Sequence, residues 1–244
     1  MANEVSHVIA PNDEMFNGDL EHYLSVGRSA IRNIDIALAV SSAPPIKRIL
    51  DLPCGHGRVL RALVRRFPDA EITACDISHD AVDFCAGTFG VEGVYSRTEA
   101  GGIPIDKEFN LIWSGSLLTH LDEANAVKFL LWFADRLADG GILVVTLHGR
   151  FSIVRQLSGA HKYVGDQAFF GALQGYLGRG YGYVDYDGRE GFGLSLTSPS
   201  WATAWVEGRE DIRLLSYGES AWDSHHDVLM LQKARAGWKT IRGR

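Results

Sequence analysis

The sequence contains little cysteine and no pair of cysteines at the spacing of a metal site. Its 244 residues include only Cys54, Cys75 and Cys85, and none of these forms a C-x-x-C motif. A zinc cluster or a disulfide framework requires more ligands at closer spacing. The cysteine content therefore argues against both and indicates a protein of the reducing cytoplasm.

The chain also lacks an excess of positive charge and any long apolar run. Its 24 Lys and Arg residues against 30 Asp and Glu residues give a formal net charge of -6, which argues against nucleic acid as a partner. No segment reaches the roughly 18 uninterrupted apolar residues that suggest a membrane span. The first residues do not combine a basic run with an apolar stretch, as an export signal does. We therefore expect neither nucleic acid nor a membrane among its partners.

What the chain does contain is a succession of short apolar runs that alternate with helical patterns. With 46% hydrophobic and 22% charged residues it has an ordinary globular composition, and its length suits one domain. Runs bounded by breakers predict strands at 46–52, 71–76, 93–97, 109–114 and 142–147. Helices are predicted between them at 59–67, from Ser78 to about 86, and at 122–137, the last closed by Gly140 and Gly141.

The last part of the chain predicts two further strands, at 211–217 and 227–232, separated by residues 219–226 and pairing in an antiparallel manner. The alternation of strands and helices implies an α/β fold. We therefore predict a doubly wound, mostly parallel seven-stranded sheet whose last strand is antiparallel.

Two segments lie outside this alternation within the single domain of residues 1–244. Residues 1–45 form an N-terminal preface with a helix at 20–40, which ends before Pro44-Pro45. Residues 151–193 are rich in Gly and Tyr and sustain no long apolar face. We interpret them as an inserted, irregular lid whose aromatic rings either select the substrate or form the core of a small subdomain or dimer contact.

A glycine-containing turn follows the first predicted strand. Gly55 and Gly57 stand where the chain turns sharply and passes close to a ligand. The carboxylate of Asp51, at the end of the strand, is unfavourable for a phosphate but suits an ammonium group. A dinucleotide-binding turn would carry a third glycine where this chain has Leu60. Binding of NAD is therefore the weaker interpretation of this turn.

An acidic residue ends the second predicted strand. Asp76 follows the glycine turn at close to the roughly 20-residue spacing at which a carboxylate binds ribose hydroxyls. Ser78 is the better N-cap for the next helix, which leaves Asp76 for a ligand. An adenosine is implied, and S-adenosylmethionine combines one with an ammonium group.

Several segments together resemble the class I, seven-strand Rossmann-like family of S-adenosylmethionine-dependent methyltransferases. Residues 49–58, Ile-Leu-Asp-Leu-Pro-Cys-Gly-His-Gly-Arg, resemble its first motif, and residues 74–78 its second. Residues 109–114 and 137–145 resemble later motifs. The resemblance implies an S-adenosylmethionine site formed by Tyr23, Asp51, Pro53, Gly55, Gly57, Arg58, Asp76, Ile77, Thr98, Glu99 and Ser114.

The resemblance is not complete. Thr98 and Glu99, ahead of Ile103-Pro104, match the family's adenine contacts only approximately, and Asn110 replaces its usual Asp. The Asn/Asp-Pro-Pro-Tyr signature of enzymes that methylate nucleobases or glutamine is absent, which disfavours those acceptors.

Histidine is the expected base if the acceptor is a hydroxyl that must lose a proton. His120 follows the strand that ends at Ser114, in a loop where such enzymes reach their acceptor. A role in local packing at a helix start is the alternative. Their spacing does not make the histidines a metal site, so no metal is expected. Candidate acceptor contacts are His148, Tyr163, Tyr181, Trp222 and His225.

We therefore expect a cytoplasmic enzyme, with a homodimer compatible with the sequence, that methylates a hydroxyl of a small molecule or a saccharide. Methylation of an amine stays open. Two alternatives are a non-catalytic module that binds S-adenosylmethionine or S-adenosylhomocysteine and, third, an NAD-dependent oxidoreductase.

Overall fold

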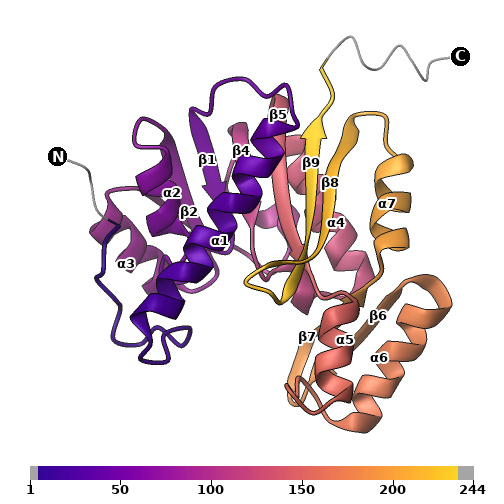
Figure 1. Cartoon of the computed structure of the whole chain (residues 1–244). Coiled ribbons are helices and arrows are strands. Elements are labelled where there is room, and N and C mark those ends of the chain that lie inside the picture. The colour runs from indigo at the N-terminus through magenta and orange to yellow at the C-terminus, as the bar shows by residue number, and fades with distance from the viewer. Residues whose placement is uncertain (1–4, 236–244) are drawn as a thin grey trace, which may run out of the picture.

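A seven-stranded sheet forms the centre of the fold in the computed structural model, which describes residues 5–235 (Figure 1). The strands lie in the order β3-β2-β1-β4-β5-β9-β8. Neighbours from β3 through β5 pair in parallel, whereas β9 is antiparallel to both β5 and β8. The predicted sheet is therefore confirmed. Its strands are β1 (Arg48–Asp51), β2 (Glu71–Asp76), β3 (Glu92–Tyr95), β4 (Phe109–Ser114), β5 (Leu137–Leu147), β8 (Ile212–Trp222) and β9 (His226–Lys233).

Helices cover both faces of the sheet. Adjacent residues of a strand point to opposite faces, so Ile49 packs in one hydrophobic cluster and Leu50 in the other. One cluster includes residues of α1 (Leu20–Ala39), α2 (Leu60–Arg66) and α3 (His79–Phe89). The other includes residues of α4 (Glu123–Arg136) and α7 (Pro199–Glu207). The predicted cap is present, since Ser78 Oγ accepts from the backbone N–H of Ala81 at the start of α3.

Two predicted boundaries are wrong. Gly140 and Gly141 do not close the preceding helix; they lie inside β5, where the register against β4 shifts. Gly140 has a φ of +74°, and a Cβ on Gly141 would lie 2.9 Å from the Phe109 carbonyl oxygen. The connection between the last two strands, expected at 219–226, is also shorter. The strand β8 runs to Trp222, and His226 already belongs to β9.

The segment predicted to be irregular is instead a small α/β unit, which we call the lid. It contains α5 (Arg150–Leu157), α6 (Asp166–Arg179) and the antiparallel pair β6 (Tyr181–Tyr186) and β7 (Arg189–Thr197), and it projects below the main sheet in Figure 1. Its own core consists of Ile153, Phe169, Ala172, Leu194 and Leu196.

Glycine residues explain why the helices and strands of the lid were not predicted. Gly180, with a φ of +82°, ends α6, and a Cβ on Gly182 would lie 1.7 Å from the carbonyl oxygen of Ala172. Helix and strand therefore approach through backbone atoms, and the apolar periodicity that identifies such elements is diluted. Across residues 5–235, no helix is both long enough and apolar enough to cross a membrane.

We predict that Gly182→Ala destabilises the protein by about 3 kcal/mol, because the added methyl overlaps the Ala172 carbonyl. The control is Gly178→Ala in α6, where a Cβ meets nothing within 4 Å. That change should stabilise by about 0.5–1 kcal/mol through helix propensity. Urea denaturation followed by circular dichroism measures both, and equal midpoints for the two variants would contradict the packing described here.

Candidate active site

The turn after β1 exposes backbone at the carboxyl edge of the sheet, the usual ligand edge of such folds. Gly55 and Gly57 have φ values of +48° and +81°, which favour glycine. A Cβ on Gly57 would lie 2.5 Å from the Phe89 ring. A Cβ on Gly55 would meet nothing within 4 Å, so a ligand can lie directly against the backbone there.

Asp51, at the end of β1, is a buried carboxylate without a partner. Neither of its carboxylate oxygens has a hydrogen bond within the described residues, although the residue is only 1% exposed. Burial, followed by repulsion from Asp76, raises the pKa of this carboxyl well above its usual value. An unpaired charge in the interior is costly, so the site is suited to a ligand that brings a cation. The hydroxyl of Ser114, buried at the end of β4, is also unpartnered.

Asp76 is fixed beside the glycine turn by two backbone hydrogen bonds. Its carboxylate accepts from the N–H of Gly55 at 2.8 Å and from the N–H of Ser78 at 2.9 Å. Each oxygen keeps capacity for a further bond, as ribose hydroxyls require. The adjoining side chain of Ile77 is 58% exposed and offers an apolar surface.

Three other predicted cofactor contacts are less constrained. Thr98 and Glu99 are exposed after β3, and Glu99 precedes a short 3₁₀ helix without capping it. Pro53 is half-buried directly after β1. Their contacts with a cofactor stay predictions.

Arg58 carries a cation into the site. No hydrogen bond or ion pair involves its side chain among residues 5–235, and its guanidinium carbon lies 5.9 Å from the centre of the Trp222 ring. Burial lowers the pKa of Arg58. Tyr23, by contrast, is held by the N-terminal arm of residues 5–19, because its hydroxyl donates to the carboxylate of Asp13.

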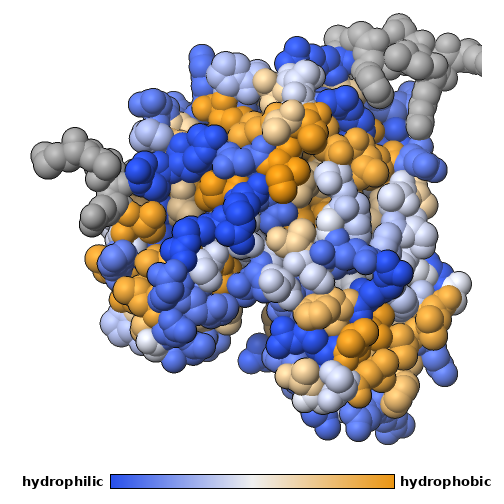
Figure 2. Space-filling model, in the orientation of Figure 1, coloured by the Kyte–Doolittle hydropathy of each residue, from blue (hydrophilic) through white to orange (hydrophobic). Residues whose placement is uncertain are grey.

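A cavity of about 310 Å³ lies between this edge of the sheet and the lid. Figure 2 shows the molecule notched between the lid and the half that carries α1. The cavity brings together the predicted base His120, the predicted acceptor contacts His148, Tyr163, Trp222 and His225, and the predicted cofactor contact Arg58. No sequence pattern pointed to Met15 or Ser116, and Tyr186 was indicated only as one of several aromatic residues of the lid. The remaining lining residues are Val26, His161, Asp223 and His226.

The tautomer of His120 follows from its contacts. Nδ1 lies 3.0 Å from the carbonyl oxygen of Gly193, and a carbonyl only accepts, so Nδ1 carries the hydrogen. Nε2 then has the free electron pair and lies 3.4 Å from Ser116 Oγ. Burial lowers the pKa of His120, which keeps the ring neutral. Local packing therefore accounts for Nδ1, while Nε2 is available as a base.

Tyr181 is not an acceptor contact, and this prediction is wrong. The residue is 1% exposed and its hydroxyl donates to the carbonyl oxygen of Leu121 at 2.8 Å. Its ring packs 4.9 Å from that of Trp201 in the main core. The position of Tyr181 along β6 explains its burial, because the side chain faces the sheet domain and not the cavity. Trp222 has two roles: it lines the cavity and also donates from Nε1 to the carbonyl of Val26.

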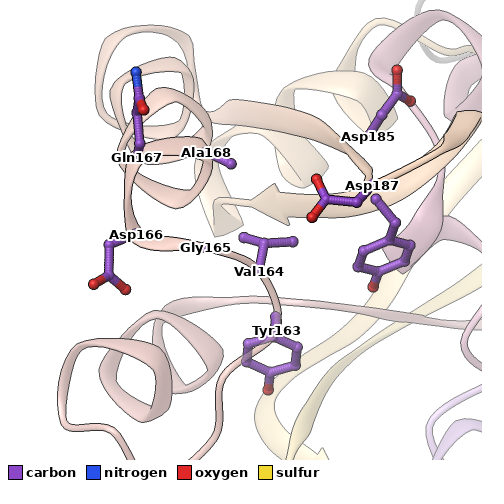
Figure 3. A pocket seen from close by; sticks show the side chains of 9 residues that line it. Tyr163, Val164, Gly165, Asp166, Gln167, Ala168, Asp185 and Asp187 are labelled. Carbon is purple, nitrogen blue, oxygen red and sulfur yellow. The ribbon is translucent and has the colours of Figure 1, made fainter.

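A second pocket of about 540 Å³ adjoins the cavity on the lid side (Figure 3). Tyr163 and Tyr186 line both spaces. Three carboxylates, of Asp166, Asp185 and Asp187, line the outer pocket. The outer pocket is therefore acidic and shares its two aromatic rings with the cavity.

Comparisons with known proteins agree with this geometry. Residues 49–141 match the model of a family described as a methyltransferase domain. A fatty-acid O-methyltransferase of Mycolicibacterium smegmatis is 32% identical over 68 residues, which are 27% of this chain and 25% of that protein. The biotin biosynthesis bifunctional protein BioCD of Bordetella avium is 30% identical over 108 residues, 43% of this chain and 23% of that protein. The chain thus spans about a quarter of the length of these relatives.

Solved structures share the fold at low identity. An S-adenosylmethionine-dependent methyltransferase from Clostridium acetobutylicum has a TM-score of 0.57 and 12% identity, covering 89% of this chain and 93% of its own. The amino pentose methyltransferase CalS10 of Micromonospora echinaspora, solved with S-adenosylmethionine, has a TM-score of 0.56 and 14% identity, covering 91% and 99%. Sheet order and glycine turn define a class I methyltransferase fold. Residues 49–141 match a methyltransferase domain and lie within this fold, which argues against the oxidoreductase alternative.

We predict that Asp51→Asn stabilises the ligand-free protein, and more at about pH 8 than at about pH 5. Because the folded carboxyl has a raised pKa, it keeps a proton that the unfolded carboxyl has lost. Folding stability therefore falls as the pH rises through this interval and stays lower above it. Asparagine does not ionise, so the variant should not lose folding stability in this way as the pH rises.

Urea midpoints at the two pH values measure this effect. The exposed carboxylate of Asp69 supplies the control, since Asp69→Asn should give the same difference from the wild type at both. A pH-independent change for Asp51→Asn would show that ionisation of Asp51 is not the source of the cost.

Proposed function

We propose that this protein transfers the methyl group of S-adenosylmethionine to a hydroxyl of a small molecule or saccharide. The main support is the unprotonated Nε2 of His120, which lies in the cavity that Arg58 also lines. A base at this place can take the proton that a hydroxyl acceptor must lose. We place the reaction in the cytoplasm, in agreement with three free, buried cysteines.

The residues fit the charges of S-adenosylmethionine. Asp51 would accept from the ammonium group, which would give its unpartnered carboxylate oxygens a donor, and Arg58 would bind the carboxylate of the methionine end. Asp76 would bind the ribose hydroxyls. When bound, the cofactor supplies a methyl group on a positively charged sulfur.

Further residues complete the proposed cofactor site. Ile77 would pack on the adenine, with Thr98 and Glu99 as its polar contacts. Pro53 and the hydroxyl of Ser114 would line the methionine end, which Tyr23 and the N-terminal arm would close. Arg61 supports this arm, because it donates to the carbonyl oxygens of Ser6 and Val8 at 2.8 and 2.9 Å.

The acceptor would lie in the cavity between His120 and the lid. There the protein acts mainly by positioning, and His120 Nε2 accepts the hydroxyl proton. The carboxylates of the outer pocket accept hydrogen bonds, which a polyhydroxylated acceptor can donate. One relative is named a fatty-acid O-methyltransferase, which supports transfer to oxygen, and one solved neighbour an amino pentose methyltransferase, which supports a sugar acceptor.

The cofactor site predicts a result in calorimetry. The wild type should bind S-adenosylmethionine and S-adenosylhomocysteine, and Asp76→Ala should weaken both by about 10- to 100-fold through the loss of charged hydrogen bonds. Asp69→Ala, an exposed acid ahead of β2, serves as the control and should bind like the wild type. Equal affinity of Asp76→Ala and the wild type would remove Asp76 from the site.

If His120 is the base, its replacement should affect turnover but not cofactor binding. His120→Ala should lower turnover by about 100-fold or more, while affinity for S-adenosylhomocysteine changes little. The assay follows S-adenosylhomocysteine release with a panel of phenols and saccharides. A parallel loss of both quantities would make His120 structural, and cofactor binding without turnover on any acceptor would favour the non-catalytic binding module.

A further inference from the structure

Three histidines from distant parts of the sequence meet in the wall of the cavity. His148 follows β5, and His225 and His226 lie at the turn into β9. One ring nitrogen of each lies within 4.8 Å of the others. Ring centres are 4.7 Å apart for His148 and His226 and 4.4 Å apart for His225 and His226. Spacing in the sequence concealed this group, which the pairing of β5 with β9 assembles.

The group retains unused imidazole nitrogens. Nδ1 of His148, a residue only 3% exposed, is buried without a hydrogen bond in the described part of the chain. His226 Nδ1 lies 3.3 Å from Thr146 Oγ1, and no hydrogen bond to its Nε2 is found within residues 5–235. Buried polar atoms are normally satisfied, so packing alone does not explain this arrangement. A cation between the rings would use the free electron pairs.

The donor set selects the kind of ion. Imidazole nitrogens suit Zn²⁺ and related transition metals, whereas Mg²⁺ and Ca²⁺ prefer oxygen ligands. Burial lowers the pKa values of His148, His225 and His226, which keeps the rings in the neutral form that binds metals. Arg58 and Asp223 also line the cavity, so one fixed charge of each sign faces the group.

We propose that His148, His225 and His226 bind one divalent transition-metal ion of the Zn²⁺ class, with a position left open for the acceptor oxygen. Three protein ligands and one open position are the arrangement of catalytic zinc sites. The second half of this proposal rests on the proposed methyl transfer; the binding of the ion does not.

The ion would complement His120. The ring of His120 lies 6.2 Å from that of His148, on the same cavity. Coordination lowers the pKa of a bound hydroxyl. Its O–H bond then breaks, the proton passes to His120 Nε2, and the oxygen keeps the electron pair while it stays on the metal. The hydroxyl of Tyr163, in contact with His225 Nε2, marks a place where an acceptor oxygen reaches the group.

The test uses the full chain after treatment with a chelator and dialysis. Titration with Co²⁺ is followed by visible absorption and titration with Zn²⁺ by calorimetry. We expect one ion per chain and a loss of affinity of at least about tenfold in His225→Ala, the least buried of the three positions. His79→Ala, which removes a histidine stacked on Tyr95 at 3.9 Å, should bind like the wild type.

A double variant, His148→Gln with His226→Gln, should abolish the Co²⁺ spectrum; if circular dichroism shows it unfolded, His225→Ala alone decides. No binding by the wild type, or equal binding by His225→Ala, would overturn the proposal. S-adenosylhomocysteine titration of the same samples separates the two proposals. Metal binding without cofactor binding leaves the metal site standing, whereas full turnover in the chelated protein removes the metal from the reaction.

Discussion

The pairing of β5 with β9 is the constraint on which the site depends. The antiparallel register sets Leu147, the last residue of β5, opposite Asp227. The residues just beyond, His148 and His226, are therefore brought into contact although they are far apart in the sequence. The same ladder inserts β9 between β5 and β8, so that Trp222 reaches α1 and closes one wall of the cavity. A slip of one residue would turn these side chains to the opposite face.

At the carboxyl edge of β1 and β2, the charged side chains suit a ligand better than they suit the stability of the empty protein. Asp51 and Asp76 end adjacent parallel strands, so the sheet itself places two carboxylates near one another. Asp76 is satisfied by backbone donors, whereas Asp51 has none. Arg58 makes no hydrogen bond or ion pair with its side chain among residues 5–235, although Asp223 and Asp13 lie near enough to influence its pKa. Ionisation of the buried, unpartnered Asp51 carboxyl would destabilise the empty protein. A ligand with an ammonium group would offset this cost, and its carboxylate would bind Arg58.

The sequence allowed prediction of what local patterns encode. The parallel strands, the glycine turn and the Ser78 cap follow from short-range rules, and all are present. The lid was predicted as an inserted segment, but its helices and strands were missed because α6 and β6 meet at Gly182, where contact is made by backbone and leaves no apolar period. Tyr181 was misplaced because composition does not tell which face of a strand a tyrosine occupies. The grouping of His148 with His225 and His226 depends on strand pairing between distant segments, which no local pattern records.

The histidine content of the sequence acquires a meaning only when the fold shows where these residues lie. Five of the nine histidines, at 120, 148, 161, 225 and 226, line one cavity. Their environments differ, and the difference suits them to different chemical roles. His120 has one nitrogen committed to the Gly193 carbonyl, which fixes a single base directed at the cavity. His148 has an unpartnered nitrogen in a group where three rings face one another. Uncharged imidazoles so close together gain little by mutual contact, but a shared cation would bind all three, so the fold itself separates a proton acceptor from a metal-binding group within one space.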